Sequence, residues 1–95
     1  MMFEVIDKSG RIIHFTEEPW NHLSKHRHEQ NILELIKETL QQPAKITDYS
    51  LDEKVRLYYR YYKDKLPPAK YLRVIVKYLN GKGFIVTAHF VEKIQ

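Results

Sequence analysis

The stretch "KYLRVIVKYLNGKGFIVTAHFV", residues 70–91, decides the fold. Two runs rich in β-branched and aromatic residues flank the turn residues "NGKG", which predicts an antiparallel hairpin. Side chains of a strand alternate between its two faces, so the first run gives one predicted core set: Leu72, Val74, Val76 and Tyr78. The second run gives the matching set: Phe84, Val86, Ala88 and Phe90. Both sets share a face only if the loop has an odd length, such as Gly81 to Gly83, with Gly83 in the left-handed conformation.

A third strand is predicted upstream in "VRLYYRYY", residues 55–62. Alternation places one set inward: Val55, Leu57, Tyr59 and Tyr61. The face away from the helices is then expected to collect basic and aromatic side chains with one threonine and one histidine: Arg56, Tyr58, Arg60, Tyr62, Tyr71, Arg73, Lys77, Thr87 and His89. Cations suit phosphates, flat rings suit unpaired bases, and an imidazole can move protons. This face is therefore the predicted binding surface for nucleic acid.

The N-terminal half supplies a hairpin and two helices. "FEVID" and "RIIHF" flank "KSG", which predicts a hairpin over residues 3–7 and 11–15. Thr16 is a suitable N-cap for a helix over about 17–26, and a second helix over about 29–42 ends before Pro43. A further strand is predicted in "KITDYS". The chain is thus expected to be one α+β domain, residues 1–95, with an antiparallel β-sheet of four or more strands and two N-terminal helices packed on one face.

Composition narrows the class of protein. The 95 residues contain no cysteine, no apolar run of 18 residues and no leader pattern, so we expect no disulfide, no membrane contact and a cytosolic location. Charge is uneven: residues 54–82 hold nine basic residues and one acidic residue, whereas the remainder holds seven basic and eleven acidic ones. This block indicates an anionic partner, with nucleic acid first, or alternatively a solvated lysine-rich surface. The lack of a glycine-rich phosphate loop, a serine hydrolase spacing or a carboxylate pair argues against an NTPase, a serine hydrolase and a glycosidase.

Three of the five histidines lie in "WNHLSKHRHEQN", residues 20–31. His22 and His26 are four residues apart, as in the zinc motif H-E-x-x-H, but Leu23 occupies the position of the glutamate. No carboxylate is suitably placed beside them, so neither a metal nor another cofactor is expected. Proton transfer by His26, a supporting role for His22 and an ordinary helix surface remain open, and His28 is expected to lie at the surface.

A series of short motifs resembles a known family. In chain order these are "W-N-H-L-x-x-H", "I-K-E-T-L-Q-Q-P-A-K-I", "Y-Y-R", "Y-L-R-V-I-V-K" and "G-F-I-V-T-A-H-F". They are similar to motifs of the phage-type nuclease domains of the BECR group, named for Barnase, EndoU, colicins and RelE. The resemblance runs from about Thr16 to Ile94. It implies a small α+β nuclease that cuts RNA without a metal, as a toxin or within phage-related elements.

The resemblance also implies a reaction and a set of site residues. In such enzymes the 2′-hydroxyl of RNA attacks the adjacent phosphate, which leaves a cyclic phosphate and a free 5′-hydroxyl. The matching positions are His26 on the helix, Arg60 on a strand, Lys77 at the end of "R-V-I-V-K" and Thr87 in "I-V-T-A". The chain departs from the family twice, with "H-R-H-E" where "H-P-E" is common and His89 where tyrosine is common.

Three hypotheses for the function follow. The leading one is a metal-independent endoribonuclease, with His26 and His89 as acid and base in either order and Thr87 as a hydrogen-bond donor. Its phosphate and substrate contacts are expected from seven residues: Arg60, Arg73, Lys77, Arg56, Tyr58, Tyr62 and His22. The second is a non-catalytic RNA-binding module that uses the same face. The third is a protein-interaction domain with an acidic partner, and a toxin would itself need an antitoxin or immunity protein.

Overall fold

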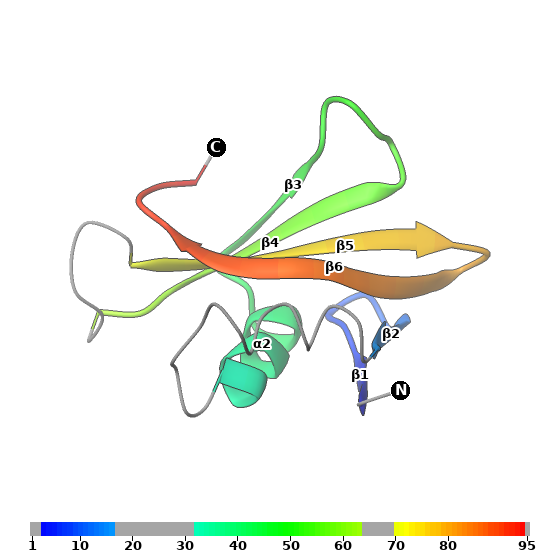
Figure 1. Ribbon diagram of the computed structural model, residues 1–95, viewed down its shortest axis with the longest axis horizontal. Coiled ribbons are helices and arrows are strands. Elements are labelled where there is room, and N and C mark those ends of the chain that lie inside the picture. The colour runs from blue at the N-terminus through cyan, green and yellow to red at the C-terminus, as the bar shows by residue number, and fades with distance from the viewer. Residues whose placement is uncertain (1–2, 17–31, 64–69, 95) are drawn as a thin grey trace.

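A computed structural model describes residues 3–16, 32–63 and 70–94. These residues form a six-stranded sheet and a helix (Figure 1). The elements are β1 (Phe3–Ile6), β2 (Ile12–Phe15), α2 (Ile32–Gln41), β3 (Lys45–Asp48), β4 (Val55–Tyr61), β5 (Tyr71–Leu79) and β6 (Lys82–Val91). The architecture is α+β as predicted, but only one of the two predicted helices is seen, because the helix predicted over 17–26 lies outside the described residues. No helix in the described ranges is long and apolar enough to cross a membrane.

The sheet has the strand order β1-β2-β6-β5-β4-β3. Neighbouring strands pair antiparallel except β2 and β6, which run parallel at Ile13↔Gly83 and His14↔Phe84. The predicted antiparallel sheet is therefore a mixed one. The predicted N-terminal hairpin is confirmed, and it joins the sheet beside the last strand because Ile13 and Phe15 are fully buried in the core.

The helix α2 packs on one face of the sheet. Ile32, Ile36 and Leu40 recur at helical spacing and are buried in the main core. Burial of such a side chain contributes about 1.5–3 kcal/mol relative to exposure. The helix ends before Pro43, as predicted, and the Lys8 amide donates a hydrogen bond to the Leu40 carbonyl at 3.3 Å. Figure 1 shows α2 below the strands β4, β5 and β6, on the side toward which the β1-β2 hairpin extends.

The loop between β5 and β6 is shorter than predicted. It has two residues, Asn80 and Gly81, with φ of 54° and 79°, as a type I′ turn requires. The predicted odd-length loop with Gly83 in the left-handed conformation is therefore wrong. Gly83 is instead needed for space, because a Cβ there would lie 2.9 Å from Ile13 Cγ1 and 3.0 Å from a ring carbon of Tyr78.

The strand β6 contains a bulge at Val86, between two pairs of the β5-β6 ladder: Ile75↔Thr87 and Val76↔Ile85. The extra residue shifts the alternation by one position. Side chains after the bulge therefore point to the face opposite to the one that an unbroken alternation would give. Ile85 and Ala88 are therefore both in the core, while Val86 is 49% exposed. The predicted inward positions of Phe84 and Val86 are wrong because unbroken alternation was assumed.

The faces of β5 are as predicted, but those of β4 are reversed. All four predicted core residues of β5 are buried: Leu72, Val74, Val76 and Tyr78. The β4-β5 ladder aligns three of them with residues of β4: Arg56↔Val76, Tyr58↔Val74 and Arg60↔Leu72. Directly paired residues share a face, so these β4 side chains lie on the α2 side and not on the opposite side.

The reversal has a physical cause, because β4 buries apolar side chains on both of its faces. Tyr58 belongs to the main core under α2. Val55, Leu57 and Tyr59 form a second apolar cluster on the other face, where Ile94 packs against it. The pattern of apolar and polar residues therefore cannot tell which side chains of β4 point toward α2.

Candidate functional site

The side of the sheet away from α2, here called the helix-free face, gathers four of the predicted site residues. In the strand register Arg73 pairs with His89, and Ile75 pairs with Thr87. Lys77 lies two residues beyond Ile75 on β5 and points to the same side. Arg73, Lys77, Thr87 and His89 thus share a face, as predicted. Tyr71, two residues before Arg73 on β5, also lies on this face as predicted. The remaining described residues predicted to join them lie on the α2 side: Arg56, Tyr58, Arg60 and Tyr62.

Arg73 and His89 form a close polar pair on this face. The Arg73 Nε–H donates to His89 Nε2 at 3.1 Å, and the Arg73 Nη2 also contacts the same nitrogen. Because a guanidinium can only donate, Nε2 must accept, and a neutral His89 ring then carries its proton on Nδ1. The strand pairing fixes the two Cα atoms side by side, which explains how residues 16 positions apart come together.

Lys77 has a carboxylate partner on the turn that precedes β4. Its Nζ lies 3.2 Å from Asp52 Oδ2. The backbone amide of Lys54 donates to the other oxygen of Asp52 at 2.9 Å. This amide and the Lys77 ammonium hold the pKa of Asp52 below its ordinary value. An ionised Asp52 therefore keeps the Lys77 ammonium at the edge of the sheet.

A hollow of about 450 Å³ opens on the helix-free face between these groups. Its lining combines apolar and charged side chains: Tyr49, Asp52, Val55, Leu57, Arg73, Ile75, Lys77 and Val86. The Val86 bulge contributes directly, because it turns an apolar side chain out into the hollow. Apolar walls with two cations at the rim suit a ligand that has a flat apolar part and an anionic part.

Tyr49 and Asp52 were not among the site residues predicted from the sequence. Both lie on or next to the turn between β3 and β4, and only the β4-β5 register brings that turn beside Lys77. Tyr59 was expected in the main core, but it pairs with Arg73 across β4 and β5 and therefore lies on the helix-free face. The Tyr59 hydroxyl is buried and has no hydrogen-bond partner among the described residues. The signal available in sequence was the tyrosine count alone, which gives no position.

Arg60 and Tyr62 are engaged with α2 on the covered side of the sheet. The Arg60 guanidinium donates to the Gln42 carbonyl at 2.6 Å and lies 3.4 Å from Glu38 Oε1. The Tyr62 hydroxyl donates to the same Glu38 oxygen at 2.7 Å. Burial and this hydrogen bond raise the pKa of Tyr62 to about 12. These contacts fasten the end of β4 to the last turns of α2.

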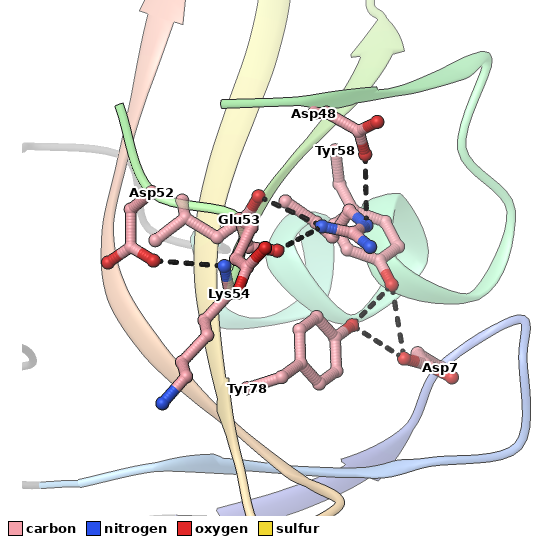
Figure 2. Close-up of polar contacts among 9 residues, drawn as sticks. Asp7, Asp48, Asp52, Glu53, Lys54, Tyr58 and Tyr78 are labelled. Atoms are coloured by element: carbon pink, nitrogen blue, oxygen red, sulfur yellow. Dashed lines mark hydrogen bonds and ion pairs between the residues drawn. The ribbon is translucent and has the colours of Figure 1, made fainter. Parts of the chain in front are cut away.

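Tyr58 takes part in a buried polar network with Asp7 and Tyr78 (Figure 2). The Tyr58 and Tyr78 hydroxyls donate to Asp7 Oδ2 at 3.0 and 2.7 Å, and the Ser9 and Arg11 amides donate to Oδ1. Burial opposes the charge, but a hydrogen bond from the Ser9 hydroxyl to Oδ1 at 2.6 Å and those from Tyr78, Arg11 and Tyr58 together hold the pKa of Asp7 below its ordinary 3.8. Burial raises the pKa of Tyr58 to about 12 and that of Tyr78 as well. Tyr58 therefore has a role in the core and is not placed for base stacking on the helix-free face.

The predicted histidines of the N-terminal helix, His22 and His26, lie outside the described residues. Within the described ranges, no three histidine, aspartate or glutamate side chains gather as metal ligands. Arg56, also predicted to contact substrate, pairs through Nε with Asp48 at 3.1 Å on the α2 side. Of the predicted set, the helix-free face thus holds His89, Arg73, Lys77 and Thr87.

These features define a class: an α+β protein with a cationic, imidazole-bearing sheet face around an open hollow. Residues 4–95 match the family described as phage-Barnase-EndoU-ColicinE5/D-RelE like nuclease2, PBECR2, and the chain belongs to this family. Nuclease activity and a nucleic-acid substrate follow at the level of the family. Neither the curated proteins nor the solved structures give a match to the chain.

Proposed function

We propose that this protein is a metal-independent endoribonuclease whose chemistry takes place on the helix-free face. One observation carries the proposal: in a chain of a nuclease family, Arg73 is hydrogen-bonded to His89 at the rim of a hollow that also holds Lys77. A cleaving site needs positive charge for the phosphate and a group that titrates near neutrality. This face supplies both within one strand register.

The reaction is a transfer within the substrate. The 2′-hydroxyl oxygen attacks phosphorus, the bond from phosphorus to the 5′-oxygen breaks, and the products are a cyclic phosphate and a free 5′-hydroxyl. One residue takes the proton of the 2′-hydroxyl, and another gives a proton to the leaving oxygen. Arg73 and Lys77 reduce the cost of the negative charge that develops on the phosphate.

His89 is proposed as one of the two proton-transfer groups. Before substrate binds, its Nε2 accepts a hydrogen bond from Arg73. A phosphate in the hollow offers Arg73 a stronger, charge-assisted partner. As Arg73 turns to the phosphate, Nε2 becomes able to exchange a proton with the substrate. The pair thus keeps the base masked until an anion arrives.

The apolar part of the hollow is proposed to hold a base next to the cleaved bond. Tyr49 is 40% exposed and Val86 is 49% exposed, and both line the hollow. Stacking of a base on an aromatic ring is worth roughly 1–3 kcal/mol and tolerates different sequences. The substrate is therefore expected to be single-stranded at this point.

The remaining assignments rest on the matched positions in sequence. His26 is proposed as the partner of His89 in acid–base chemistry, with His22 in support, and Thr87 as a hydrogen-bond donor on the helix-free face. Arg60 is proposed to act through α2, because its guanidinium is bound to Glu38 and the Gln42 carbonyl.

The test is cleavage of mixed RNA in excess chelator, with chemical analysis of the new ends. Cyclic phosphate and 5′-hydroxyl ends are expected from the wild-type protein. His89→Ala and His26→Ala should each lower the rate at least about a hundredfold with little change in unfolding. His14→Ala is the matched control, because His14, on β2, forms an ion pair at 3.0 Å with Glu4 of β1 and does not line the hollow. Full activity in both site variants would remove the assignment.

A non-catalytic RNA-binding module is the second candidate, favoured by the exposed rings at one end of the helix-free face. Tyr61 is 48% exposed and meets Tyr71 edge to face at 5.2 Å between ring centroids. Such a pair can stack unpaired bases. This function predicts salt-dependent RNA binding that weakens in Lys77→Gln, with no new RNA ends at any enzyme concentration.

A toxin-like role, within a phage-related element and in the cytoplasm, is the proposed biological setting. A cell that makes a ribonuclease in its own cytoplasm requires an inhibitor of that enzyme. An antitoxin or immunity protein with acidic groups for Arg73 and Lys77 would compete with RNA for the helix-free face.

A further inference from the structure

A second hollow, of about 370 Å³, lies on the α2 side of the sheet near the start of β4. It is lined by Arg11, Glu53, Lys54, Arg56 and Tyr78. Three cations and one carboxylate thus surround a small space with an aromatic wall. None of these residues belongs to the hollow of the helix-free face.

The position of Arg11 is fixed by the buried Asp7 network. The Arg11 guanidinium lies over the Tyr78 ring, 4.9 Å from its centroid. Asp7 accepts a hydrogen bond from the Tyr78 hydroxyl and another from the Arg11 amide, so one carboxylate orients both the ring and the turn that carries Arg11. A guanidinium that stacks through its plane still has N–H groups at its edge for a bidentate anion.

The other two cations enter from the turn before β4. The Arg56 Nη1 donates to the Glu53 carbonyl at 2.8 Å, and its Nε faces Asp48, so Arg56 is partly neutralised. The Lys54 side chain extends away from Asp52 in Figure 2. In the described part of the chain, Arg11 and Lys54 form no ion pair. The hollow therefore keeps positive charge after its internal pairs are made.

The two hollows lie on opposite faces of the same end of the sheet, since successive residues of the turn and strands alternate between them. Asp52, Val55 and Lys77 line the first hollow. The residues that follow them, Glu53, Arg56 and Tyr78, line the second. Opposite faces of one strand end are within reach of a few linked nucleotides, each of which carries a phosphate.

We propose that this second hollow binds a backbone phosphate of the RNA strand whose cleaved nucleotide occupies the helix-free face. The inference rests on the proposed function and extends it: the strand passes over the turn between β3 and β4 and is held at two places. Binding at the second place adds affinity for long strands and contributes nothing to a dinucleotide, which cannot span both hollows.

The test uses 2′-O-methyl RNA, which binds but lacks the attacking hydroxyl, as a dinucleotide and as a dodecanucleotide. Arg11→Gln should weaken binding of the dodecanucleotide roughly threefold or more and leave binding of the dinucleotide unchanged. It should also lower the slope of log affinity against log salt concentration by about one. Lys8→Gln removes the same charge from the same turn outside the hollow and should match the wild type. Lys77→Gln should weaken the binding of both the dinucleotide and the dodecanucleotide. Equal affinities for Arg11→Gln and Lys8→Gln would overturn the proposal.

Inorganic phosphate separates this inference from the proposed function, because it probes the second hollow without RNA chemistry. Titration should shift the backbone amide NMR signals of Arg11 and Lys54 in the wild type and not in Arg11→Gln. Such shifts in a protein that cleaves no RNA would support the second hollow and refute the nuclease. RNA cleavage with no shift at these amides would support the nuclease and refute phosphate binding in the second hollow. Capture of an acidic peptide at Arg11 that RNA does not displace would also overturn the proposal.

Discussion

The two faces of the sheet use charged side chains in different ways. On the α2 side, the Asp7 carboxylate and the Arg60 guanidinium are bound to groups of the fold itself. On the helix-free face, Arg73 and Lys77 contact His89 and Asp52 at the rim of an open hollow. Both faces hold cations, so their number does not locate a site. Open space beside a cation does, on either face, because a ligand reaches only those cations that line a hollow.

The largest effect is expected from Asp7→Ala on the α2 side. The change removes the carboxylate to which two buried tyrosine hydroxyls donate and leaves these hydroxyls only each other as partners, which should lower the free energy of unfolding by about 3 kcal/mol. Urea unfolding followed by circular dichroism measures it. Asp48→Ala, with a side chain 81% exposed, is the control and should keep a midpoint near that of the wild type. Equal midpoints for the two variants would show that the network is not structural.

The next effect compares one arginine from each face. Arg73→Gln should lower RNA cleavage about a hundredfold, because it removes a charge next to the reacting phosphate. Arg60→Gln should lower cleavage by less than about threefold, since its guanidinium is bound to α2. Initial rates on one labelled RNA decide between them. A larger loss in Arg60→Gln would move the chemistry to the α2 side.

A smaller effect is expected from changing one side chain on each face of the sheet. Gly83→Ala places a Cβ 2.9 Å from Ile13 Cγ1 and should cost about 1–2 kcal/mol of stability. Val86→Ala removes apolar atoms that are half exposed on the helix-free face and should change stability by less than about 0.5 kcal/mol. Thermal unfolding of both variants gives the comparison. A stable Gly83→Ala would mean that β2 and β6 can separate at little cost.

The smallest effect is a dependence of stability on alkaline pH. The pKa of Tyr58 is raised from 10.0 to about 12 in the fold. A raised pKa means that the neutral phenol is favoured in the folded state, so its contribution is complete below pH 10 and is lost as the pH rises towards 12. Unfolding midpoints at pH 8 and 11 should therefore differ less in Tyr58→Phe than in the wild type. An identical difference in both proteins would contradict the assignment to Tyr58.

The sequence was sufficient for strands with one apolar face and insufficient where that asymmetry is missing. β5 alternates cleanly, so its core residues and the outward positions of Arg73 and Lys77 were predicted correctly. β4 is apolar on both faces, which moved Arg60 to the wrong side. The Val86 bulge leaves no mark in a run of apolar residues. In the Asp7 network, Asp7 binds Tyr58, which is 51 positions away in the chain, and Tyr78, which is 71 positions away. No local pattern in the sequence encodes such contacts.

The parallel pairing of β2 with β6 links the order of synthesis to the completion of the fold. A ribosome releases β6 last, yet β2 has no neighbour on its inner edge until β6 is present. Contacts between such distant segments form late, because a long loop must close before they are gained. His89 lies on that same final strand. A nascent chain that stops before residue 82 thus lacks both the inner neighbour of β2 and the His89 side chain.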